Sequence, residues 1–260
     1  MNRILTTLFA LLLIQFLVVK KTYSDEGEVK DCFEKLNRVT FAFNMGLDKV
    51  IFKPISKGYR KLPSPIRTGT GNALSNLSNL VTIPNNILQG DFRSAANNSA
   101  RLLINTTLGI AGIFDPANSF GFEKREREDF GQSLGVMGVG EGCYLVLPVL
   151  GPSTVRDTVG SLIAMNGGDV WHNITVRDDE EYVKEFKESD YWVSRVTSGV
   201  DFRAKNLEAF DAMEKNSVDL YATVRSLYLQ DRENKIKNVQ RGNLEIIFED
   251  DNGWEEIENK

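Results

Sequence analysis

The chain has 260 residues, of which 42% are hydrophobic and 26% charged, and it carries a net charge of −5 at pH 7. This composition is too apolar for an intrinsically disordered chain, and the acidic balance argues against a nucleic-acid-binding protein, which normally presents a basic face. One His and two Cys cannot supply the three or four His or Cys ligands of the usual zinc sites, so we expect neither a metal nor a cofactor.

The first 24 residues have the pattern of a secretory signal peptide. A basic residue precedes an apolar run at 4–19, two Lys residues follow it, and cleavage is predicted between Ser24 and Asp25. Sixteen residues are short for a bilayer span, which needs about 20, although the two Lys favour the alternative of an uncleaved N-terminal anchor. Cleavage would leave 28 basic and 36 acidic residues, a net charge of −8.

Helical periodicity dominates the first half of the mature chain. Apolar residues recur at helical steps over 31–53, 67–83 and 92–108. We expect the first of these helices to end at Pro54, the second at Pro84 and the third at Gly109. The helix at 31–53 is apolar on more than one side, which fits either a central core helix or a helix that touches both core and lipid.

Residues 131–151 differ from the rest because they contain six glycines and a proline, Pro148, inside an apolar run. Proline is poorly tolerated in a central strand, so we expect an extended or re-entrant loop here. Helical periodicity returns at 177–196 and 201–229. No segment alternates convincingly like a strand, and the predicted fold is therefore all-α with Gly- and Pro-rich loops.

The domain organisation follows from these patterns. Residues 1–24 form the signal peptide and residues 25–240 one helical domain. The last segment, 241–260, is strongly acidic, with seven Asp and Glu among the final sixteen residues, and we expect it to be a disordered tail.

One enzyme motif is present. Residues 131–135 fit the G-x-S-x-G nucleophile elbow with Ser133 as nucleophile, and Asp157 or Asp169 and then His172 follow in the order that such hydrolases use. The elbow needs a buried strand before it and a helix after it, but a highly charged run precedes it and a Gly-rich run follows it. A serine hydrolase is therefore the weakest of the functional interpretations, and we expect no enzyme.

Other candidate sites have simpler explanations. The glycines miss the spacing of a dinucleotide-binding loop because Cys143 stands where a third Gly is needed, and no Walker motif exists, so we do not expect ATP use. The acidic run 178–181 could bind a metal, but four carboxylates at a helix start more often form a solvated N-terminus. For the lone His172 beside Trp171, a structural role is the simpler interpretation.

Over about 31–232 the chain resembles the MlaA (VacJ) family of outer-membrane lipid-asymmetry proteins. Matching motifs begin with Asp31, Phe33, Glu34, Leu36, Asn37 and Arg38, continue through 65–90 and 101–117, and end with Tyr144–Ser153, Arg156 and Asp157. The densest block consists of Glu128, Asp129, Phe130, Gly131, Gln132, Leu134, Gly135, Gly138, Val139 and Gly140.

The resemblance implies a flattened ring of amphipathic helices around a central polar channel, at the periplasmic face of the outer membrane. It implies removal of misplaced phospholipids from the outer leaflet, passively through the channel, to a soluble periplasmic carrier, by a protein bound to a trimeric porin. Tight turns between packed helices are the alternative role for the glycines. The candidate lipid-path residues are Asn37, Asn44, Gly131, Gly135, Gly138, Gly140 and Tyr144.

Two departures from the family pattern concern cysteine. Family members carry a lipobox Cys directly after the signal, whereas Cys32 lies inside the first family motif, so no lipid anchor is predicted from it. Cys32 and Cys143 both stand where the family tends to Pro, which hints that they bond to each other; two buried thiols are the alternative. Because the lipobox is missing, a soluble periplasmic helical binding or structural protein remains an alternative function.

Overall fold

The structure, a computed structural model, describes residues 31–177 and 186–237. The predicted signal peptide, the acidic run 178–181 and the predicted tail 241–260 lie outside the described residues. The elements are α2 (Glu34–Leu47), η1 (Asp48–Phe52), α3 (Lys53–Arg60), α4 (Ser64–Leu88), α5 (Phe92–Thr107), α6 (Pro116–Ser119), α7 (Phe130–Val136), β1 (Tyr144–Leu147), β2 (Gly151–Thr154), α8 (Val155–Ile163), η2 (Ala164–Gly168), α9 (Val170–His172), η3 (Asn173–Arg177), α10 (Glu188–Lys205), α11 (Leu207–Asn216) and α12 (Leu220–Ile236).

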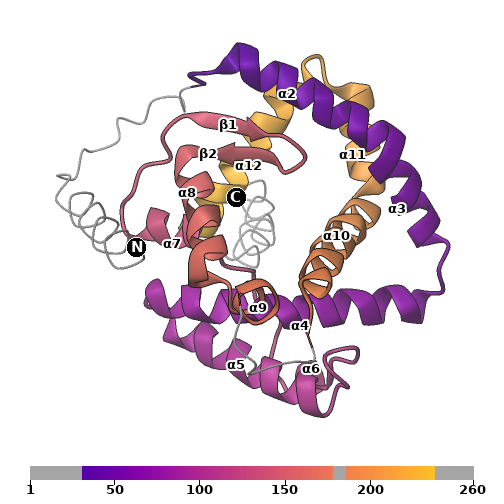
Figure 1. Ribbon diagram of the computed structural model, residues 1–260, viewed down its shortest axis with the longest axis vertical. Coiled ribbons are helices and arrows are strands. Elements are labelled where there is room, and N and C mark those ends of the chain that lie inside the picture. The colour runs from indigo at the N-terminus through magenta and orange to yellow at the C-terminus, as the bar shows by residue number, and fades with distance from the viewer. Residues whose placement is uncertain (1–30, 178–185, 238–260) are drawn as a thin grey trace, which may run out of the picture.

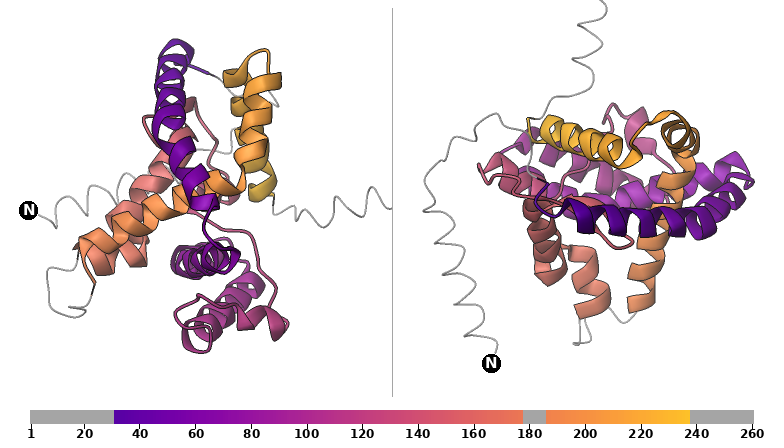
Figure 2. Two further views of the ribbon diagram at one scale, coloured as in Figure 1. Left: turned by 90° about the vertical axis from the view of Figure 1, so that its right-hand side faces the viewer. Right: turned by 90° about the horizontal axis from the view of Figure 1, so that it is seen from above.

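The helices form a flattened ring. In Figure 1, α2, η1 and α3 make one arc, α4 with α5 and α6 makes the opposite arc, and α7, α8 and the β1–β2 hairpin lie on the third side. Seen edge-on, α11 and α12 lie on one face of this disc, whereas α8 and α10 project from the other (Figure 2). The predicted all-α ring is therefore confirmed for the described residues.

Two prolines do not end their helices, contrary to prediction. At Pro54 the helix continues through η1, a one-residue bulge in which the Lys53 N–H donates to the Asp48 carbonyl, so Pro54 falls in the first turn of α3, where its missing N–H costs little. Pro84 lies inside α4, which runs on to Leu88. The Asn85 side-chain amide donates to the carbonyl of Val81 at 2.8 Å, which supplies a bond in the turn that Pro84 disturbs.

The prediction of a loop without strands at 131–151 is wrong, because this segment begins with the helix α7 and ends in a short antiparallel hairpin. Pro148 lies just beyond β1, in the turn. Pro152 faces Val146, whose N–H points to the opposite edge and donates to the side-chain oxygen of Asn37. The pair is thus a non-hydrogen-bonded one, so the missing N–H of Pro152 breaks no ladder bond.

Candidate functional site

The distribution of side chains is inverted relative to that of an ordinary soluble domain. Among the described residues, exposed large apolar side chains outnumber buried hydrophobic ones several-fold, while many Asn, Asp and Arg side chains are buried. Soluble monomers rarely expose so much apolar surface. No described helix has both the length and the apolarity to cross a bilayer. We define the apolar rim as Phe33, Leu36, Val39, Phe43, Val50, Ile51 and Ile55 on the α2–α3 arc and Leu103, Leu108, Ile110 and Phe114 on and after α5.

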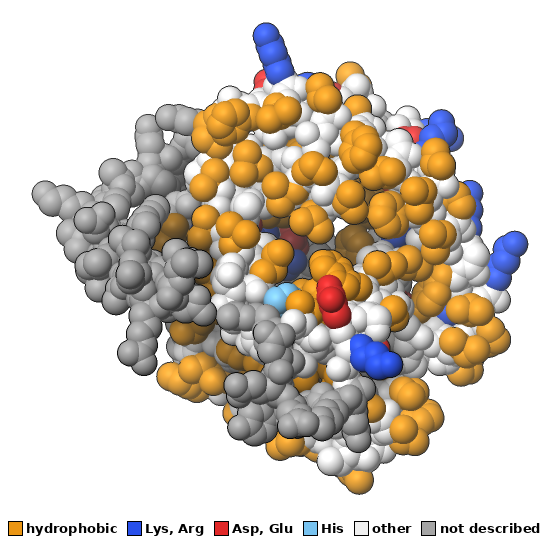
Figure 3. Space-filling view, viewed as in Figure 1, with side chains coloured by type: hydrophobic (Ala, Val, Ile, Leu, Met, Phe, Trp, Pro, Cys, Tyr) orange, Lys and Arg blue, Asp and Glu red, His pale blue; other side chains and the backbone are white. Residues whose placement is uncertain are grey.

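One face of the ring is hollowed. Figure 3 shows apolar side chains spread over this face and a depression near its middle, inside which acidic and basic atoms are visible. The hydrophobic core proper is small and lies to one side, where Tyr144, Val146 and Tyr221 pack with Phe41 and Tyr228. The ring therefore combines a polar centre with an apolar exterior.

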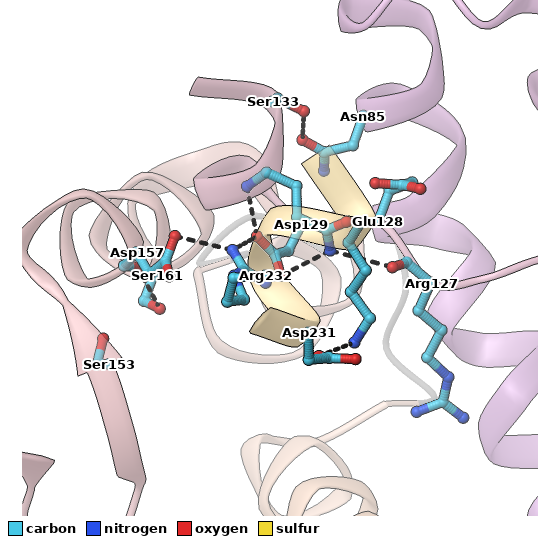
Figure 4. Close-up of polar contacts among 12 residues, drawn as sticks. Asn85, Arg127, Glu128, Asp129, Ser133, Ser153, Asp157, Ser161, Asp231 and Arg232 are labelled. Atoms are coloured by element: carbon cyan, nitrogen blue, oxygen red, sulfur yellow. Dashed lines mark hydrogen bonds and ion pairs between the residues drawn. The ribbon is translucent and has the colours of Figure 1, made fainter. Parts of the chain in front are cut away.

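An ion-pair network centred on the buried Arg232 joins α7, α8 and α12 (Figure 4). Arg232 of α12 donates to Asp129, the N-cap of α7, at 2.6 and 2.9 Å, and to Asp157 of α8 at 2.8 Å. The Tyr228 hydroxyl donates to Asp157 at 2.6 Å. Burial by itself would raise the pKa of Asp129, but the hydrogen bonds and charge of Arg232 outweigh it and lower that pKa to about 2.

Two glycines make this network possible. A Cβ on Gly131 would lie 2.5 Å from the Oδ1 of Asp157, and a Cβ on Gly160 would lie 2.3 Å from the backbone N of Gly131. The backbones of α7 and α8 therefore touch, which brings the Asp157 carboxylate within reach of Arg232. Within the densest motif block, Gly131 therefore permits a close contact between two helices.

Glu128 is next to this network, but none of the described residues forms an ion pair with it. Its carboxylate accepts a hydrogen bond from Gln89 at 2.9 Å, and its backbone N–H donates to Thr82. Burial raises the pKa of Glu128 to about 7, despite the hydrogen bond from Gln89. The folded protein thus holds a proton on this group that the unfolded chain would release above pH 4.5.

This shift predicts a pH-dependent stability. Because the pKa of Glu128 is higher in the folded state, this group stabilises the fold fully below about pH 4.5. The stabilisation declines as the pH rises to about 7. Glu128→Gln should flatten this decline and raise the free energy of unfolding at pH 8 by roughly 1–3 kcal/mol. Urea unfolding between pH 5 and 8 measures this, with the exposed Glu123→Gln as control. Parallel profiles for wild type and Glu128→Gln would refute it.

Asn37 and Asn44 act as substitute strand partners for the outer edge of β1. The Asn37 amide donates to the Tyr144 carbonyl at 3.0 Å and accepts from the Val146 N–H at 2.9 Å. Two helical turns later, the Asn44 amide donates to the Leu147 carbonyl at 2.9 Å and accepts from the Val149 N–H at 2.7 Å. The two side chains thereby fasten the hairpin to α2.

Asn37 should be important for stability because it is almost fully buried. Asn37→Leu leaves the Tyr144 carbonyl and the Val146 N–H without partners, and we expect a loss of about 2–4 kcal/mol in the free energy of unfolding. Chemical denaturation in detergent measures it. Asn118→Leu, at an exposed position, should change stability by less than about 0.5 kcal/mol; similar losses in both variants would contradict this role.

Cys32 and Cys143 form a disulfide, with the two Cα atoms 5.6 Å apart. The bond fixes the chain just before α2 to the residue just before β1. Next to it, Asp31 accepts hydrogen bonds from Asn37, Arg225 and Tyr221, which ties the same point to α12. The start of the described chain is therefore held by a covalent bond and an ionic one.

The chain matches the family described as MlaA lipoprotein over residues 29–235. It therefore belongs to the MlaA lipoprotein family. It is 32% identical to the Escherichia coli protein named intermembrane phospholipid transport system lipoprotein MlaA, covering 80% of this chain and 78% of that one. For the Haemophilus influenzae protein of the same name the identity is 29%, over 82% and 81% of the two chains. An uncharacterized Rickettsia prowazekii protein is 35% identical over 81% of this chain and 79% of its own.

A solved structure, described as the structural basis for maintenance of bacterial outer membrane lipid asymmetry, has a similar fold. Its TM-score to this chain is 0.65 with 30% sequence identity, and the match covers 78% of this chain and 97% of that one. The MlaA fold thus agrees with the ring described above.

The lipid-path residues predicted from the MlaA resemblance occupy several environments. Asn37, Asn44 and Tyr144 lie at the α2–hairpin contact, and the Tyr144 side chain is fully buried. Gly131 and Gly135 pack closely, the latter against Ile236. Gly138, just after α7, has a φ of +89°, and neither it nor Gly140 has neighbours where a Cβ would stand. These residues do not converge on one lining, and their part in a lipid path stays a prediction.

The residues of the hydrolase interpretation do not form a triad. Ser133 is buried in α7, where its hydroxyl donates to Asn85 at 2.6 Å and accepts from Gln89 at 3.2 Å. The ring of His172 packs against Tyr191, with 4.9 Å between centroids. Asp169 caps α9 and pairs with Arg195. No hydrogen bond connects Ser133 to His172 in the described part of the chain, and no group of residues there could hold a metal ion.

Sequence reasoning missed the residues that organise the interior. Arg232, with its hydrogen bonds to Asp129 and Asp157, is one; Arg101, which pairs with Asp115 at 2.7 Å, is another. Arg101, Asp115, Asp129 and Asp157 all stand in the MlaA motifs. Their position in the family motifs was the signal available in the sequence. A charged residue that only faces water needs no fixed position in a motif.

Proposed function

We propose that this chain transports phospholipids between membranes, as its named relatives do by their description. It would sit in the outer membrane at the periplasmic face and remove misplaced phospholipids from the outer leaflet. The observation that carries the proposal is the pairing of an apolar exterior with a polar, hollowed centre in a chain of the MlaA family.

The physical requirement for such a protein is to keep acyl chains out of water while the charged headgroup moves. Two chains of about 16 carbons, at ~0.8 kcal/mol per CH₂, would cost on the order of 25 kcal/mol if fully exposed. The apolar rim supports residence in hydrocarbon without a spanning helix. Backbone and polar groups at membrane depth are tolerated where they line a passage, and we propose that the hollow is part of such a passage.

The compartment is proposed on two grounds. A disulfide is stable in an oxidising compartment such as the periplasm, and the predicted signal peptide would direct the chain there. The route is proposed to be passive, since no nucleotide-binding motif is present. A trimeric porin and a soluble periplasmic carrier, expected from the resemblance, complete the proposal as partners.

The experiment is rescue of an Escherichia coli strain that lacks its own MlaA. Outer-leaflet phosphatidylethanolamine is measured on intact cells with an amine reagent that does not cross membranes. Expression of this chain should return the labelled fraction to the wild-type level. A labelled fraction equal to that of the empty vector, with the chain present in the outer-membrane fraction, would overturn the proposal.

A matched pair of variants tests the membrane role of the rim. Val39 is 68% exposed on α2, so Val39→Asp should cost little if water surrounds it but about 2–3 kcal/mol in hydrocarbon. We expect Val39→Asp to lose membrane association and rescue, and the exposed Lys49→Asp on the same arc to keep both. Full membrane retention of Val39→Asp, or recovery of the wild type as a soluble protein, would instead favour a soluble periplasmic binding protein.

A further inference from the structure

Residues 122–129, which we call the strap, lead into α7 without helix or strand structure. Side chains of neighbouring helices hold the backbone of the strap. Near its start, Asn97 of α5 donates to the carbonyl of Glu123 at 2.8 Å, and near its end Gln132 of α7 donates to the carbonyl of Arg127 at 3.1 Å. The strap is thus attached by individual hydrogen bonds, each of which can be lost separately.

Glu128 fastens the last part of the strap to α4. Its backbone N–H donates to the hydroxyl of Thr82 at 3.4 Å, and its carboxylate accepts from the side-chain amide of Gln89 at 2.9 Å. The same amide also donates to Ser133 of α7 at 3.2 Å. Glu128 is only 9% exposed, so its carboxyl group is enclosed among hydrogen-bonding groups that carry no charge.

The charged groups around Glu128 do not compensate an ionised carboxylate. On α12, Arg232 attracts it, but the N–H groups of this guanidinium are directed at Asp129 and Asp157 (Figure 4). Asp129, the N-cap of α7, and Asp91, the N-cap of α5, are acids that oppose a further negative charge. Ionisation of Glu128 in place would therefore leave a buried charge with one neutral hydrogen-bond donor, which is costly.

We propose that Glu128 is a pH-sensitive latch, whose protonated side chain holds the end of the strap against α4 and whose ionised side chain leaves this site for water. On release the proton goes to solvent, and the carboxylate gains the hydration that the amide of Gln89 alone cannot replace. The strap then detaches locally. Helix α7 stays in place, because Arg232 still binds Asp129 and the contact with α8 does not involve Glu128.

The latch should work near neutral pH. Burial, the largest cause, raises the pKa of Glu128 from 4.5 to about 7 in the attached state. If the released side chain titrates at 4.5, the ratio of released to attached strap rises about tenfold between pH 6 and pH 8. This opening is local and precedes any loss of the ring, unlike the global unfolding considered above.

The test is amide hydrogen exchange of the purified full chain in detergent at pH 6, 7 and 8, corrected for the intrinsic pH dependence of exchange. We expect the protection of the Glu128 amide to fall about tenfold from pH 6 to pH 8, while that of the α5 amides stays constant. Glu128→Gln cannot ionise and should keep the strap equally protected at all three pH values.

Two control variants should keep the tenfold change. Glu123→Gln removes an exposed carboxyl group from the strap, and His172→Gln removes the one histidine of the chain, a residue type that titrates near neutral pH. PH-independent protection of the wild type overturns the proposal, as does the wild-type pH dependence in Glu128→Gln.

Two further outcomes decide between a local latch and other causes. An equal loss of protection in α5 and in the strap overturns the proposal, since the whole fold would then be opening. Thr82→Val removes the acceptor of the Glu128 N–H, so it should lower strap protection at every pH and keep the tenfold ratio. A lost ratio in this variant counts against Glu128 as the titrating group. The inference is independent of the proposed function, because exchange is measured without phospholipid.

Discussion

Replacing Arg232 by Met is expected to lower the free energy of unfolding by about 2–4 kcal/mol, because the buried Asp157 and the half-exposed Asp129 lose their shared cation. Asp129 and Asp157 both accept from this guanidinium, and the pKa of each is lowered in the folded state by an amount that depends on it. Met keeps much of the side-chain volume, so the loss reports charge more than packing. Urea denaturation in detergent at pH 7 measures it.

The control is a partly exposed ion pair on the same helix. Lys235 lies 2.6 Å from Asp231, and Lys235→Met should cost less than about 1 kcal/mol because water screens the pair. Combining Arg232→Met with Asp129→Asn should recover part of the stability, since Asp129 then carries no unpaired charge and Asp157 keeps its ion pair with Arg156. Equal losses in Arg232→Met and Lys235→Met would contradict the role of the network.

Opening the Cys32–Cys143 disulfide is expected to cost about 4 kcal/mol. The bond closes a loop with a sequence separation of 111, and the loss of loop entropy in the unfolded chain grows with loop length. Asp31 would also lose part of its fixed position against Tyr221 and Arg225. Thermal melting with and without reductant measures the effect, which should appear as a lower Tm in reductant.

The variant that carries both Cys32→Ser and Cys143→Ser should melt at the Tm of the reduced wild type and should not respond to reductant. Mass spectrometry after alkylation, without reductant, should find no free thiol in the wild type. Two alkylated cysteines, or a Tm that reductant leaves unchanged, would refute a stabilising disulfide.

The helices were largely predictable because their apolar periodicity is local. The proline boundaries were not, since what lets the chain pass Pro54 and Pro84 is a bulge in one helix and a side-chain hydrogen bond in the other. The hairpin was missed for a related reason. The edge of β1 is completed by Asn37 and Asn44, more than a hundred residues earlier, and alternation within β1 alone is too short to predict a strand.

The candidate site was less predictable than the fold. Arg232 stands between Asp231 and Glu233 and has the pattern of a solvated helix face, and only the approach of α7 and α8 through Gly131 and Gly160 makes it a buried centre. Contacts between distant segments leave no periodic pattern in the sequence. Several of the residues that make these contacts, such as Asp129 and Asp157, nevertheless lie in the family motifs.

The most direct test of the account uses two photoreactive phospholipids, one with the diazirine in the headgroup and one with it in an acyl chain. Membranes that contain the wild-type chain are irradiated, and labelled peptides are identified by mass spectrometry. We expect the headgroup probe to label α4, α10 and the β1–β2 hairpin, which border the centre of the ring in Figure 1, and the acyl probe to label the apolar rim on α2, α3 and α5. Labelling of the rim by both probes, with none on α4, α10 or the hairpin, would contradict passage of phospholipid through the ring.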